Sequence, residues 1–174
     1  MRGHDPYKAM EMLRRMFVVG LVGLTVACTL FADKYGPLAE HLHSPEGFSE
    51  WKQNEQVLRQ AADAAIARYR QEESMETLRV SETAMREYLD HGFLLLRAYK
   101  AADFVLPPGL EDSLSERTDR FMDVADGYLK QGSEIVAVSI AREVVLKYSD
   151  LERMDRAQRR AEALLMKYRY QRNY

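Results

Sequence analysis

The amino-acid sequence predicts an all-α protein, in which one N-terminal transmembrane helix is followed by antiparallel helix pairs. The 174 residues include only nine glycines and five prolines, and such a composition favours helices over a β-rich fold. Apolar residues recur at three- and four-residue spacing along otherwise charged segments, whereas no segment alternates as a half-buried strand does. The third observation is a stretch without any charged residue, residues 16–32.

The uncharged stretch predicts a membrane span. As a helix it would be about 25 Å long, slightly short of a hydrocarbon core of about 30 Å, and flanking side chains can make up the difference. Arg14 and Arg15 stand at its N-terminal end, and basic residues outnumber acidic ones before it, so the positive-inside rule keeps the N-terminus inside. Gly20 and Gly23 would let the span pack closely against another helix.

These features divide the chain into four predicted parts. Residues 1–15 form a cytoplasmic segment, 16–32 the transmembrane helix, 33–46 a juxtamembrane loop and 47–174 a helical domain. The predicted location is an inner (or energy-transducing) membrane, crossed once, with the helical domain on the periplasmic side.

A lipoprotein signal is the alternative interpretation of the same stretch. The sequence Thr25-Val26-Ala27-Cys28 resembles a lipobox, in which Cys28 is acylated after the preceding residues are removed. Thr25 departs from the usual leucine, and the chain stays apolar after Cys28. We therefore favour the uncleaved span. The single cysteine also excludes an intramolecular disulfide and a zinc site of the CxxC type.

Six helices are expected after the span. Ser44 and Pro45 suit the N-cap and first position of a helix, whose apolar stripe is interrupted only by Glu55. Gly92 is expected to separate two helices, 75–91 and 93–106, and Pro107-Pro108-Gly109 to end the second of them. Three further helices are expected at 110–131, 133–148 and 151–170.

Residues 87–106 match residues 127–146 at six of 20 positions, Gly92 and Gly132 included, which suggests a repeated helix–glycine turn–helix unit. The stretch 121–149 resembles a tetratricopeptide repeat, with Ser149 where that family usually has proline. The residues that carry the resemblance are Phe121, Val124, Ala125, Tyr128, Gly132, Ala137, Ala141 and Val144. It implies stacked antiparallel helix pairs that bind a partner in a concave groove, without catalysis. An ordinary helical bundle is the alternative.

Nothing in the sequence indicates an enzyme. The patterns GxSxG, HExxH, Walker A and GxGxxG are absent. His41 and His43 form the only histidine pair, but no third zinc ligand follows at a suitable spacing. Asp119 and Asp123 share one helix face, which we interpret as a solvated acidic face. We expect no catalytic residue, cofactor, metal or small-molecule substrate.

Charge is distributed unevenly along the chain. Residues 33–141 have a net charge of −8 and residues 142–174 of +4, while the whole chain, at −2, is no generic nucleic-acid binder. Because tyrosine and arginine are enriched at interface hot spots, we expect the partner-binding residues among a set of tyrosines and C-terminal arginines: Tyr128, Tyr168, Arg169, Tyr170, Arg172 and Tyr174.

The sequence therefore predicts a non-catalytic scaffold or accessory subunit of a larger membrane complex, bioenergetic or secretory. Its expected partners are protein subunits of that complex and membrane lipid. The alternative is a tetratricopeptide-like lipoprotein, acylated at Cys28, that acts as an adaptor in outer-membrane or pilus assembly.

Overall fold

The computed structural model describes residues 35–151 and 156–171, and this part of the chain is helical without any strand. Residues 35–43 are helical and lead into α2 (Pro45–Glu72). The other helices are α3 (Met75–Ala101), α4 (Leu110–Lys130), α5 (Glu134–Lys147) and α6 (Arg156–Gln171). The predicted all-α class is confirmed.

The predicted membrane segment is not among these helices. No helix of the described residues is both long enough and apolar enough to cross a bilayer. The stretch 16–32, with Arg14, Arg15, Gly20, Gly23 and Cys28, lies outside the described residues, as do Arg172 and Tyr174.

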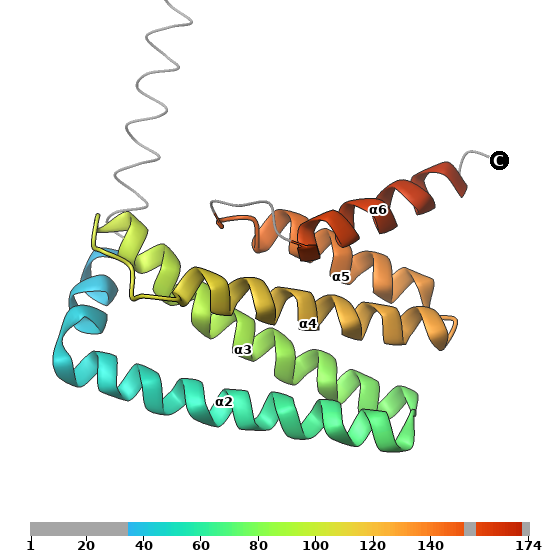
Figure 1. Ribbon diagram of the computed structural model, residues 1–174, viewed down its shortest axis with the longest axis horizontal. Coiled ribbons are helices and arrows are strands. Elements are labelled where there is room, and N and C mark those ends of the chain that lie inside the picture. Colours follow the sequence, from blue (N-terminus) through green and yellow to red (C-terminus); the bar gives the residue numbers. More distant parts are fainter. Residues whose placement is uncertain (1–34, 152–155, 172–174) are drawn as a thin grey trace, which may run out of the picture.

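Successive helices run in opposite directions (Figure 1). Helix α2 forms one long edge of the domain and α6 lies at the opposite edge. Each helix packs against the next one in the chain, and α6 also contacts α4. One continuous apolar cluster fills the spaces between them. Its largest fully buried side chains include Phe93, Phe121, Tyr128 and Tyr148.

The predicted helix start at Ser44 is confirmed. The Ser44 side chain accepts a hydrogen bond of 3.0 Å from the backbone N–H of Gly47, and Pro45 follows at the first helical position. Because the N–H groups of a first turn have no partner within the helix, such a cap satisfies one of them. The predicted turn at Gly132 is also confirmed, since this residue joins α4 to α5 with φ +73°.

The predicted break at Gly92 is wrong, because α3 continues through this residue. Gly92 is buried, and a Cβ atom there would lie 2.5 Å from Leu114 Cδ2 and 2.6 Å from Arg117 Nη1. The glycine therefore serves the close approach of α4 to α3. It does not form a turn, so residues 87–106 do not repeat the helix–turn–helix arrangement of residues 127–146.

Helix α3 also ends earlier than predicted, at Ala101. Asp103 adopts the left-handed conformation (φ +56°), and the N–H of Phe104 donates to the carbonyl oxygen of Tyr99 at 2.9 Å. This six-residue closure is the pattern of a Schellman motif, which ends a helix. The non-helical segment that follows contains Pro107 and Pro108 and separates α3 from α4.

The predicted juxtamembrane loop, residues 33–46, contains a helix instead. Residues 35–43 are helical because Ala39 and Leu42 are buried against the core. The Tyr99 hydroxyl donates a hydrogen bond of 3.1 Å to the carbonyl oxygen of Leu42. This helical stretch is thereby held against the C-terminal end of α3.

The close packing at Gly92 predicts whether replacing this glycine by alanine raises or lowers the free energy of unfolding. In an open helix Gly→Ala would stabilise by about 1 kcal/mol. Gly92→Ala should instead lower the free energy of unfolding by about 1–3 kcal/mol, because the new methyl group overlaps Leu114 and Arg117. Urea unfolding followed by circular dichroism measures this change. The cost should shrink in a Leu114→Ala background, and a stabilising Gly92→Ala would contradict the packing.

Candidate functional site

An open groove of about 590 Å³ lies at the end of the domain where α2 begins. Residues of α2, α3, α4 and the segment between α3 and α4 line it. We call it the aromatic groove, and its apolar lining consists of Pro45, Phe48, Trp51, Leu95, Tyr99, Val105, Leu106, Pro107, Pro108 and Leu110. Val105 is 90% exposed, so one wall of the groove presents a fully solvated aliphatic side chain.

Stacked rings hold the α2 side of the groove in place. The rings of Phe48 and Trp51 are 5.9 Å apart and nearly parallel, and Trp51 stacks in turn on His91 of α3 at 4.9 Å. The Trp51 indole N–H donates to the His91 carbonyl oxygen at 3.4 Å, while His91 Nε2 lies 3.0 Å from the carbonyl oxygen of Trp51. Since these contacts fix the side chains of Trp51 and His91, this wall of the groove is preformed.

A buried ion pair between Arg117 and Glu55 forms the polar floor of the groove. The Arg117 side chain is only 4% exposed and its guanidinium donates to the Glu55 carboxylate. The same guanidinium lies 4.0 Å from the Tyr88 ring centroid and donates to the Tyr88 carbonyl oxygen and to Ser113 Oγ. Arg117 therefore joins α2 and α4 across α3, beside Gly92.

Arg117 was missed as a site residue from the sequence, although one signal for it was present. Glu55 interrupts an otherwise apolar stripe of α2, and a carboxylate on a core-facing stripe requires a buried cationic partner. The partner lies 62 residues further along the chain, so the helical periodicity of α2 could not identify it.

A matched pair of substitutions tests the role of this floor. Glu55→Gln should lower the free energy of unfolding by about 1–3 kcal/mol, because it leaves the buried Arg117 charge without a carboxylate. The control is Asp63→Asn, which removes the carboxylate partner of Arg120 between two more exposed side chains (47% and 28%) and should cost less than about 1 kcal/mol. Equal losses in urea unfolding would contradict a buried, structural pair.

At the other end of the domain, Arg160 holds α6 to α4. Its guanidinium donates to three carboxylates of α4: Asp119 at 2.6 Å, Asp123 at 2.8 Å and Asp126 at 2.6 Å. Burial acts to lower the pKa of Arg160, but the three carboxylates outweigh it and raise that pKa overall. The acidic face predicted at Asp119 and Asp123 is therefore partly a docking surface for α6.

The tyrosines predicted to bind a partner lie in different environments. Tyr128 is buried, and its hydroxyl donates to Glu82 at 2.5 Å; burial and this carboxylate raise its pKa above the usual value. Tyr128 is thus a core residue and does not reach the surface. Tyr168 is half-buried on α6, where burial and the Glu134 carboxylate raise its pKa, and Arg169 is exposed. Tyr170 belongs to α6, but its side chain is not described.

The two histidines considered as metal ligands point to different partners. His41 Nε2 lies 3.7 Å from Glu50, whereas the His43 ring stacks on Phe104 at 4.4 Å beside the aromatic groove. Over residues 35–151 and 156–171, no group of three or more His, Cys, Asp or Glu side chains is arranged to hold a metal ion.

Comparison with known proteins yielded no relative from which a function could be transferred. Neither a protein family, nor a curated protein, nor a solved structure matches the chain. Any proposed function therefore rests on the residues and the geometry of the chain itself.

Proposed function

We propose that this chain is a non-catalytic, single-span membrane-anchored scaffold or accessory subunit of a larger membrane complex. Its helical domain binds a protein partner through the aromatic groove. The observation that carries the proposal is the groove itself, with Val105 90% exposed at its wall. Preformed concave surfaces lined by aromatic and aliphatic side chains are typical of binding sites, and aromatic side chains contribute most to affinity at interfaces.

The lining of the groove specifies the chemistry of the partner. The lining is mostly aromatic, aliphatic and proline residues. Of its charged side chains, Glu55 and Arg117 already bind each other, and the Lys52 ammonium lies 4.7 Å from the Phe48 ring centroid. A partner gains little by competing for this pair but buries apolar area along the walls. The expected ligand is therefore an apolar segment of a protein, such as one face of a helix.

The position of the groove in the chain supports its role next to a membrane. Helical residues 35–43 lie beside the groove, where His43 stacks on Phe104. Only residues 33 and 34 separate this helical stretch from the uncharged residues 16–32. If that stretch spans a bilayer, the groove faces partners that are held close to the same membrane.

The packing of α4, α5 and α6 supports a tetratricopeptide-like unit as the finer description of the fold. Gly132 forms the turn between α4 and α5, and α6 packs against both of these helices. Ala125, Ala137 and Ala141 are fully buried, and such small residues permit close helix crossings. The upstream copy, residues 87–106, does not fit the pattern because Gly92 lies inside α3 and not at a turn.

The lipoprotein alternative keeps the same binding role and changes the anchor. It rests on the sequence Thr25-Val26-Ala27-Cys28, in which acylated Cys28 would replace the span. In that case the chain would act as an adaptor in outer-membrane or pilus assembly.

Particle size in mild detergent tests the proposal. The wild-type chain, extracted from its native membrane, should migrate in a particle much larger than its own 20.1 kDa. Val105→Glu should release it to a small species, because a carboxylate at the groove wall cannot be desolvated against an apolar partner. Size-exclusion chromatography with light scattering reads out both results.

The matched control is Val57→Glu, which makes the same chemical change at an exposed position of α2 (59%) outside the groove. It should leave the particle intact. A wild-type chain that migrates alone would overturn the scaffold proposal, and equal effects of the two variants would overturn the groove as the binding site.

A further inference from the structure

Acidic side chains accompany the lining of the aromatic groove. Three exposed carboxylates stand one or two residues from a lining residue in the sequence, one for each of the helices that build the groove. We call them the acidic rim: Glu46 in the first turn of α2, Asp103 just after the end of α3 and Asp112 in the first turn of α4. Each of these helices therefore brings one carboxylate to the groove end of the domain.

The cations of this region do not neutralise the acidic rim. Of the two cations in the lining, Arg117 is bound by Glu55, which leaves the single ammonium group of Lys52 against three carboxylates. Lys100, near the end of α3, lies 3.3 Å from Glu111. Within the described part of the chain, no ion pair includes a residue of the acidic rim. The surroundings of the groove therefore have a net negative charge.

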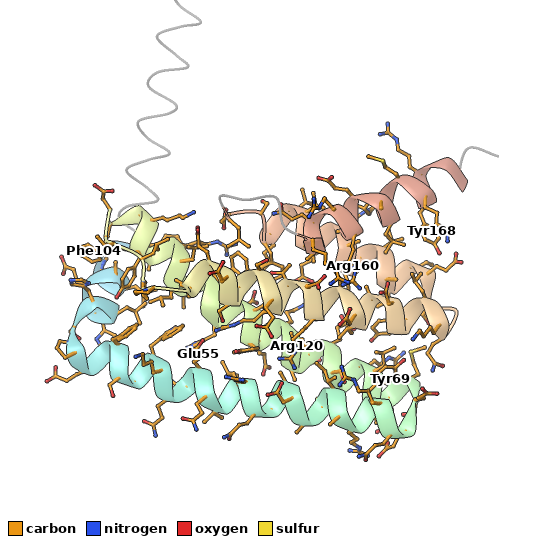
Figure 2. The ribbon with its side chains drawn as sticks, viewed as in Figure 1. Glu55, Tyr69, Phe104, Arg120, Arg160 and Tyr168 are labelled. Atoms are coloured by element: carbon orange, nitrogen blue, oxygen red, sulfur yellow. The ribbon has the colours of Figure 1, made fainter. Side chains whose placement is uncertain are left out.

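The wider domain strengthens this negative potential. The elements that line the groove all belong to residues 33–141, which have a net charge of −8, whereas residues 142–174, which include α6, have +4. Among the described helices, α6 packs against α4 and α5 and contacts neither α2 nor α3. Figure 2 shows Phe104 and Glu55 toward the end of the domain where α2 begins, and Tyr168 of α6 toward the opposite end. The cations of α6 therefore leave the groove end acidic.

From this distribution of charge we propose that the partner segment bound in the aromatic groove is basic as well as apolar. It is a protein segment with lysine or arginine beside the apolar side chains that enter the groove. This inference rests on the proposed binding role of the groove. Complementary potentials speed the association of two proteins and suppress partners of the wrong sign. The acidic rim thus attracts a basic segment and repels an acidic one of the same shape.

The aromatic wall can accommodate a cation directly. The Lys52 ammonium lies 4.7 Å from the Phe48 ring centroid, so the structure already places one cation on this wall. Aromatic ring faces attract lysine and arginine electrostatically. A lysine or arginine of the partner can lay its aliphatic stem along the apolar lining and keep its charged end near the acidic rim.

An acidic segment has less to bind. The Arg117 side chain is only 4% exposed and is already bound by the Glu55 carboxylate. Lys52 would then be the one cation of the lining open to an acidic partner, and three carboxylates of the rim oppose its approach. The balance of charge therefore favours the basic segment.

The experiment uses the full chain in nanodiscs of phosphatidylcholine, a lipid without net charge, and two synthetic helical peptides as probes. The peptides share one leucine face, lack tryptophan and carry a dansyl group; one has lysine and the other glutamate at the remaining positions. Trp51 is the only tryptophan of the chain and lines the groove, so energy transfer from Trp51 to dansyl reports binding there. Empty discs correct for peptide bound to lipid.

The lysine peptide should bind about tenfold more tightly than the glutamate peptide at low salt. This difference should shrink at high salt, because exposed charges are screened. Glu46→Gln with Asp112→Asn removes two charges of the acidic rim and should weaken binding of the lysine peptide by about two- to tenfold.

The matched control is Glu76→Gln with Glu87→Gln, which removes two exposed carboxylates of α3 outside the groove. Glu76 stands in the first turn of its helix, as Glu46 does, so the control also matches the loss of an acidic first-turn residue. It should leave the affinity unchanged.

Equal affinities of the two peptides, tighter binding of the glutamate peptide or no binding of the lysine peptide would overturn the inference. Equal effects of the rim and control variants would overturn it as well. Failure of the proposed function shows separately, in the particle size of the wild-type chain and of the Val105→Glu variant.

Discussion

The contact on which the rest of the domain depends is the reach of Arg117 across α3 to Glu55. A buried guanidinium that loses its partner costs much stability. Helix α4, which contains Arg117, and helix α2, which contains Glu55, must therefore keep a fixed position along each other. The path of the side chain runs beside Gly92, where any Cβ atom would collide with it. One glycine on α3, one arginine on α4 and one glutamate on α2 thereby fix three helices relative to one another.

This arrangement also positions the aromatic groove. The Arg117–Glu55 pair forms the floor of the aromatic groove, and the rings of Phe48 and Trp51 hold one of its walls, so the groove exists before any partner binds. Toward the other end, Arg160 of α6 pairs with Asp119, Asp123 and Asp126 of α4.

Features that depend on neighbouring residues could be predicted from the sequence, and features that depend on distant contacts could not. The all-α class, the helix start at Ser44 and the turn at Gly132 follow from local capping and composition. A glycine can form a turn or permit two helices to cross closely, and the local sequence does not distinguish these two roles. Gly92 was therefore wrongly predicted to form a turn. The burial of Tyr128 and the partner of Glu55 likewise depend on residues more than 40 positions away. The helix at 35–43 forms because of its contacts with α3, which its own sequence does not reveal.

The central claim, a helical domain held at a membrane by the uncharged stretch, is tested most directly by the intact mass of the chain extracted from its native membrane. The account predicts a chain that resists alkaline extraction and has a mass near 20.1 kDa, with residues 16–32 retained. A mass that lacks residues 1–27 and includes acyl chains would contradict the span and establish the lipoprotein. A chain recovered from the soluble fraction would contradict the membrane anchor altogether.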